Sequence, residues 1–107
     1  MISSLDNLLD MFKKMNDIGF NTSAPLKWGF YFVDADKGKL QSVFNVLKDN
    51  NYLLEDIYLS DDKNWTLHVS KIDILTPEKL HKRNNAFNEL ADYCNVELYD
   101  GWNVEKI

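Results

Sequence analysis

The side chains best suited to catalysis or metal binding in this sequence are two histidines, one cysteine and one arginine. His68 and His81 are far apart along the chain, and neither has a second ligand at the spacing that zinc sites use. Cys94 falls on the apolar side of a predicted helix, where cysteine packs as a small hydrophobic residue. Arg83 is the only arginine, and the sequence contains no glycine-rich phosphate loop that could bind an anion together with it. We therefore predict no metal, no cofactor and no catalytic centre.

Two aspartates before a glycine, Asp34 and Asp36, have the look of the start of a calcium-binding loop. An EF-hand loop needs glycine at its sixth position and glutamate at its twelfth. Lys39 and Asn45 occupy those positions here. The two aspartates are better interpreted as caps for the N-terminus of a helix.

The aromatic segment at residues 29–33, Gly-Phe-Tyr-Phe-Val, is similar to the strand signature with which RNA-recognition domains stack bases. In those domains the signature lies on the third strand, whereas here it lies on the first predicted strand. The 17 acidic residues also outnumber the 12 basic ones, and a net charge of -5 repels phosphate backbones. We interpret the segment as core packing and predict no direct binding of nucleic acid.

A third pattern, near the C-terminus, joins an acid, a glycine and two aromatic rings in four residues, Tyr-Asp-Gly-Trp at positions 99–102. In one interpretation Trp102 is a structural lid over the core and Asp100 satisfies backbone donors. In the other, Tyr99, Asp100 and Trp102 contact a partner, because aromatic anchors beside a charge are typical of binding hot spots. Asp61 and Asp62 form a polar turn and would add acidic charge to such a surface.

The elements that position these residues follow from hydrophobic spacing. Apolar residues three and four apart predict helices over about 4–18, after Asp36 as far as about 51, and from Thr76 and Pro77 to about 95. Aromatic and β-branched residues predict strands at 28–33, 52–59 and 65–74, and a short one at 96–99. Residues 60–64 are a polar hairpin loop.

After the first helix, the predicted order is strand, helix, strand, strand, helix, strand, which is the ferredoxin-like βαββαβ order of an α+β protein. The crossover rule favours a four-stranded antiparallel sheet with both later helices on one face. Because residues 28–33 are apolar on both sides, we expect the sheet to be covered on both faces, with the first helix on the opposite face or at an edge. We expect one domain over residues 1–107, with its ferredoxin-like core at about 27–102.

At its C-terminal end the sequence resembles a bacterial family, regulator of ribonuclease E activity B (RraB). The match runs from Leu90 and Ala91 through residues 95–97, Asn-Val-Glu, into the Tyr-Asp-Gly-Trp quartet. Fainter similarity covers the leucine-rich helix ending at Gly19, the aromatic first strand and a strand opening at Trp65. The resemblance implies a ferredoxin-like fold with an extra N-terminal helix. It also implies a non-enzymatic protein that binds an RNA-degrading endonuclease and dampens or redirects its activity.

Three hypotheses for the function remain open. The first is a protein-binding inhibitor of a basic nuclease such as ribonuclease E, and the second is an immunity protein that neutralises a nuclease toxin. The third is a small-molecule enzyme or ligand-binding module with a pocket between the N-terminal helix and the sheet. A lone cysteine and no signal-like leader predict a cytoplasmic protein, and no apolar run is long enough to cross a membrane.

Overall fold

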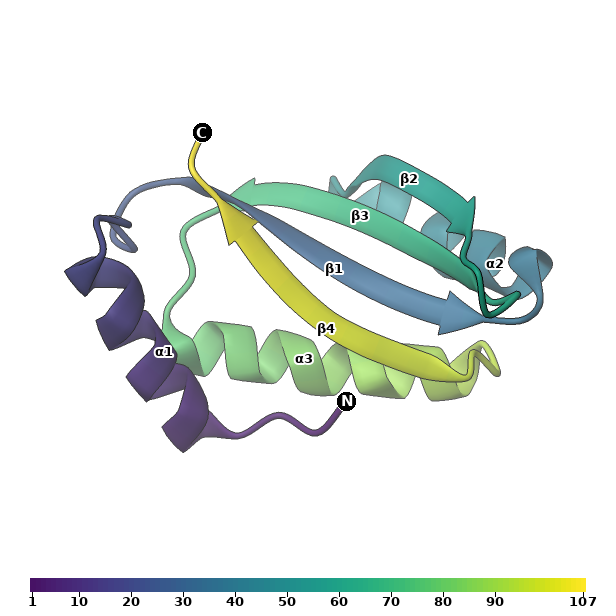
Figure 1. Ribbon diagram of the computed structural model, residues 1–107, viewed down its shortest axis with the longest axis horizontal. Helices are drawn as coiled ribbons and strands as arrows, with labels where there is room; N and C mark the ends of the chain where they lie inside the picture. The colour runs from purple at the N-terminus through teal and green to yellow at the C-terminus, as the bar shows by residue number, and fades with distance from the viewer.

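The computed structural model describes residues 1–107 and contains a four-stranded antiparallel sheet with three α-helices (Figure 1). The strands lie in the order β2-β3-β1-β4, so β1 and β3 are central and β2 and β4 are the two edges. This order confirms the predicted α+β, ferredoxin-like arrangement. The elements are α1 (Leu5–Asp17), β1 (Leu26–Asp34), α2 (Lys37–Leu47), the 3-10 helix η1 (Lys48–Asn50), β2 (Leu53–Leu59), β3 (Trp65–Asp73), α3 (Pro77–Tyr93) and β4 (Leu98–Glu105).

The three α-helices begin at capping residues of the type that the sequence predicts. Ser4, Asp36 and Thr76 each accept a hydrogen bond from a backbone N–H of the following first turn. These bonds satisfy N–H groups that have no partner inside the helix. Asp34 serves a different purpose: it is buried, and its carboxylate accepts bonds from the backbone N–H groups of Asp36 at 2.7 Å and Glu97 at 2.8 Å.

The core lies between the sheet and the helices that cover one of its faces. Phe30 and Phe32 project from β1 into this layer and are fully buried. Phe87 of α3 meets both rings, with centroids 5.0 Å from Phe30 and 5.6 Å from Phe32. Edge-to-face and tilted contacts of this kind add to the stabilisation from burying the rings.

The position of α1 corrects the expectation that the sheet is covered on both faces. Phe12 of α1 stacks on Trp28 of β1 with ring centroids 5.7 Å apart, and α1 also packs against α3. Trp28 lies two residues before Phe30 along β1, so its side chain points to the same side of the sheet. Because Trp28 is fully buried, that side must be covered there, and α1 supplies the cover. All three helices therefore lie on one side of the sheet, and Tyr31, on the other side, is only partly buried.

The last strand is also longer than predicted. The expected strand at 96–99 runs instead from Leu98 to Glu105 and passes through the whole quartet. Its register against β1 shifts between Tyr99 and Gly101, so that Asp100 forms a β-bulge. Gly101 has φ 115°, a value that glycine adopts easily and other residues rarely do. The bulge lets pairing resume, and Trp102 lies opposite Phe30.

Candidate functional site

Tyr99, the first residue of the quartet, is part of the core. Its side chain is 1% exposed, and its ring lies 5.1 Å from that of Phe32 and 5.5 Å from that of Phe87. The hydroxyl donates a 2.6 Å hydrogen bond to Oδ1 of Asn84, which is fully buried in α3. Burial raises the pKa of the Tyr99 phenol far above its usual range, so the group stays protonated as a donor. This residue joins β4 to α3.

Trp102 and Asp100 of the same strand differ in exposure. The Trp102 ring is partly buried on the helix side, with its centroid 5.7 Å from that of Trp28. Asp100, at the bulge, is exposed and forms no salt bridge. The quartet therefore presents one free carboxylate to solvent, while its two aromatic rings face the core side of the sheet.

Asp61 and Asp62 lie in the loop that joins β2 to β3, as predicted. Asp62 organises this loop: it accepts bonds from the Ser60 hydroxyl at 2.6 Å and from the backbone N–H of Asn64 at 3.1 Å. The Ser60 bond is the main cause that lowers the pKa of the Asp62 carboxyl. Asp61 is exposed and has no such bond, so it is free to contact another molecule.

The structure does not gather the five predicted binding residues into one cluster. Tyr99, Asp100 and Trp102 lie on β4, which is one edge of the sheet. Asp61 and Asp62 lie beyond the end of β2, which is the other edge. What connects the two places is the side of the sheet that no helix covers.

We call this uncovered side the open face. Its residues alternate along the strands with those of the core, and cross-strand pairing fixes which of them are neighbours. Three carboxylates and one lysine carry its charge, so the face is acidic. Its members are Lys27, Gly29, Tyr31 and Val33 of β1; Thr66, His68, Ser70 and Ile72 of β3; Leu53, Glu55, Asp56 and Tyr58 of β2; and Leu98, Gly101, Asn103 and Glu105 of β4.

Two rings stack at the centre of the open face. Tyr31 and His68 are cross-strand partners whose ring centroids are 4.3 Å apart and nearly parallel, at 13°. Burial lowers the pKa of His68 and raises that of Tyr31, so both rings are uncharged at neutral pH. Gly29 makes this arrangement possible, because a Cβ there would lie 2.7 Å from Nε2 of His68 and would also meet the side chain of Asn103.

A polar network crosses the open face from β1 to β2. The Lys27 ammonium lies 2.8 Å from Oε1 of Glu55, and the Ser70 hydroxyl donates to the same oxygen at 2.6 Å. The bond from Lys27, followed by that from Ser70, lowers the pKa of the Glu55 carboxyl. The negative charge of Glu55 is thus balanced by the Lys27 ammonium, whereas Asp56 and Glu105 have no salt-bridge partner.

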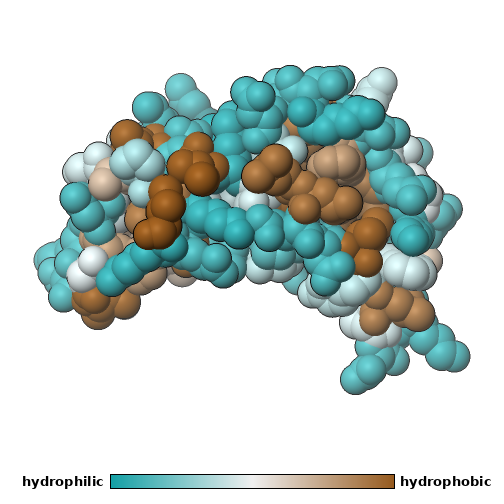
Figure 2. Space-filling view, turned by 90° about the horizontal axis from the view of Figure 1, so that it is seen from above, coloured by the Kyte–Doolittle hydropathy of each residue, from teal (hydrophilic) through white to brown (hydrophobic).

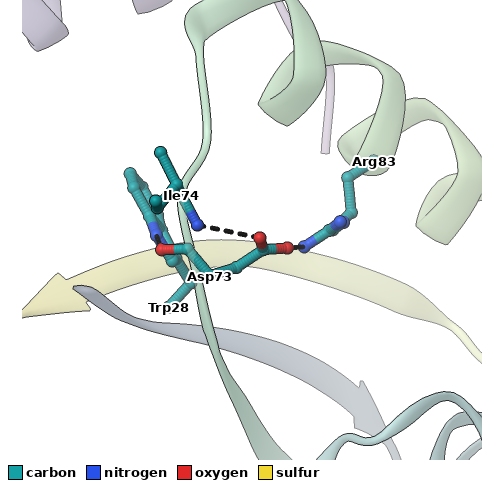
Figure 3. A network of polar contacts seen from close by, with 4 residues as sticks. All are labelled: Trp28, Asp73, Ile74 and Arg83. Atoms are coloured by element: carbon teal, nitrogen blue, oxygen red, sulfur yellow. Dashed lines mark hydrogen bonds and ion pairs between the residues drawn. The ribbon is translucent and has the colours of Figure 1, made fainter. Parts of the chain in front are cut away.

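The single arginine of the chain is held in a separate network, which Figure 3 shows. Arg83 of α3 donates to Oδ2 of Asp73 at 3.2 Å, and Oδ1 of Asp73 accepts from the backbone N–H of Ile74 at 2.8 Å. The backbone carbonyl of Asp73 accepts from the Trp28 indole at 3.1 Å. These bonds fix the end of β3 against β1 and α3, so Arg83 has a structural partner in Asp73.

The remaining candidate residues have structural partners or lie apart. His81 shares a 2.8 Å hydrogen bond with Ser3, and burial raises the pKa of the Cys94 thiol. No group of three or more histidine, cysteine, aspartate or glutamate side chains is arranged to hold a metal ion. None of the four surface pockets lies between α1 and the sheet, where Phe12 and Trp28 stack instead.

Comparison with known families identifies the family of this domain. The family described as regulator of ribonuclease activity B, RraB, matches residues 6–104. The chain belongs to the RraB family. No curated protein matches the sequence significantly. The RraB match extends from α1 to β4, so the N-terminal helix, the quartet and the open face are all parts of the family's domain.

The family description names a regulator of ribonuclease activity, not an enzyme, and a regulator acts through the ribonuclease as its protein partner. Among the helices of this RraB domain, none has the length and apolar character needed to span a membrane. The open face and the two sheet edges carry the exposed residues of this RraB domain that a binding function has to account for.

Proposed function

We propose that this protein binds ribonuclease E, or a ribonuclease of the same kind, and lowers its rate of RNA cleavage. The observation that carries the proposal is the RraB match over residues 6–104. As part of the proposal the protein works in the cytoplasm, in keeping with its single, unpaired cysteine.

Charge supports a direct contact between the two proteins. A ribonuclease must hold the phosphates of RNA on a basic surface. The chain carries a net charge of -5, and its open face, with Asp100 at one edge and Asp61 and Asp62 beyond the other, is bordered by carboxylates. Such a surface is attracted to basic patches and competes there with phosphate, and the attraction weakens as salt screens it.

The five residues predicted from the sequence have two roles in this proposal. Asp61, Asp62 and Asp100 are exposed and are proposed to contact the partner. Tyr99 is buried, and Trp102 is partly buried, so we propose that they contribute mainly by holding β4 in place.

The test is a cleavage assay with purified ribonuclease E and a fluorescent RNA substrate. Adding the protein should lower the initial rate in a saturable way, and the inhibition should weaken between low salt and physiological salt. A parallel binding measurement with the RNA alone should show no complex. An unchanged cleavage rate at every concentration, or inhibition explained by binding to the RNA, would refute the proposal.

A further inference from the structure

Strand β2 is an exposed edge with an unusually apolar surface. Its only strand neighbour is β3, so the backbone N–H and C=O groups on its outer side have no strand partner. Leu53 is 64% exposed and Leu59 is 55% exposed. Ile72 of β3, 57% exposed, borders a shallow pocket with Leu53. Figure 2 shows the molecule from above, where apolar side chains gather in patches among hydrophilic ones.

A groove runs beneath the same edge, between β2 and α2. Its volume is about 340 Å³, and it is open to solvent. Leu54 and Ile57 point into it from β2, and Phe44 points into it from α2. Gln41, Asn45 and Leu67 complete the lining. A strand placed next to β2 would direct alternate side chains into this groove and the others onto the open face.

The middle of β2 carries charge that nothing in the protein balances. Glu55 is paired with Lys27, but Asp56 is exposed and has no salt bridge. Its cross-strand neighbour on β3 is His68, whose lowered pKa leaves it uncharged at neutral pH. A basic residue opposite Asp56 on an added strand would supply the missing partner.

The same charge disfavours a second copy of this chain as the occupant. Antiparallel pairing of two β2 strands along their full length, 53–59, is centred on Asp56 and sets it opposite its own copy. Like charges directly opposite one another destabilise a strand pair. The β2 edge is therefore poorly suited to pairing with its own copy and well suited to pairing with a basic strand.

From these observations we propose that β2 takes up an extended segment of the partner ribonuclease as a fifth, antiparallel or parallel strand of the sheet. The segment has apolar residues that enter the groove of Phe44, Leu54 and Ile57, alternating with lysine or arginine residues on the side of Asp56. Main-chain hydrogen bonds provide affinity in this mode, and side-chain pockets and charges provide specificity. This inference rests on the proposed function and specifies where and how the ribonuclease is bound.

The test compares two variants that change the charge equally. Asp56→Lys alters the middle of β2, and the matched control Glu89→Lys alters an exposed position on α3. Affinity for purified ribonuclease E is measured by titration calorimetry, after circular dichroism has verified that both variants are folded. We expect Asp56→Lys to weaken binding by about tenfold, because it removes an attraction and adds a repulsion, and we expect Glu89→Lys to bind within about twofold of the wild type.

Amide hydrogen exchange and peptide binding test the strand geometry itself. In the complex, exchange should slow at residues 53–59. Among overlapping peptides from the ribonuclease, the one that binds should alternate apolar and basic residues. Equal weakening by both variants would show that only net charge matters, and unchanged exchange on β2 would place the partner elsewhere. Either result overturns the inference, as would a wild-type dimer formed through β2. If the wild type binds no ribonuclease at all, the proposed function itself fails.

Discussion

The hydrogen bond between Tyr99 and Asn84 allows a sharp test of the role of the quartet. Tyr99→Phe removes only a hydroxyl, so packing around the ring is retained. It leaves Oδ1 of Asn84, a fully buried residue, without the donor that lies 2.6 Å away. A buried acceptor left unpaired costs about 1–3 kcal/mol of folding stability. At about 4–8 °C per kcal/mol for a domain of this size, Tm should fall measurably.

Urea denaturation measures the loss, and a double-mutant cycle assigns it to the bond. Asn84→Leu in the Tyr99→Phe background removes both polar partners, so the double variant should be more stable than the sum of the two single losses predicts, by about 1 kcal/mol or more. Ribonuclease binding by folded Tyr99→Phe should equal that of the wild type. A stability change of less than about 0.5 kcal/mol, typical of surface positions, would contradict the core role of Tyr99.

Three further changes test other parts of the structure. Trp102→Ala should lower the free energy of unfolding by about 2 kcal/mol, since the ring is partly buried; unchanged stability with lost ribonuclease binding would make it an anchor instead. Gly29→Ala should cost about 1–3 kcal/mol in urea denaturation, because the new methyl group meets the side chains of Asn103 and His68. The pKa of Glu55 in the folded protein lies below its ordinary value of 4.5, so its stabilisation by Lys27 is present above pH 4.5 and is lost as pH falls through the folded-state pKa. The wild type should therefore be more stable than Glu55→Gln at pH 5, and this difference in the free energy of unfolding should be smaller at pH 3.

The order of elements was predictable because local signals and hydrophobic periods agree along this chain. The capping residues Ser4, Asp36 and Thr76 each precede an apolar stripe of helical period, and the proline at position 77 suits the first position of a helix. The polar loop at residues 60–64 separates two strand-like segments and closes a hairpin. With four strands and two crossover helices in this order, few topologies remain.

Burial on the second face of β1 was not predictable from residue type alone. Tyr31 and Val33 are apolar enough to be buried beneath a helix, and the sequence pattern does not distinguish that from an exposed aromatic face. Tyr31 instead stacks on His68, which comes from β3 and becomes its neighbour only when the strands pair. Alternation along the predicted strands gives the members of the open face, but not whether a helix covers them.

The quartet shows that a sharp sequence motif can have a structural origin. A bulge in β4 needs a residue that tolerates φ 115°, which is Gly101, and rings on either side that return to the core. Those demands are strict, so they produce a recognisable pattern. To take up a partner strand as proposed, an edge strand such as β2 needs only exposed apolar residues, free backbone groups and an unpaired acid. Many different sequences satisfy these requirements. The motif therefore reflects how the sheet is built, whereas the contacts proposed for the partner, Asp100 among them, follow from exposure, charge and unpaired strand edges.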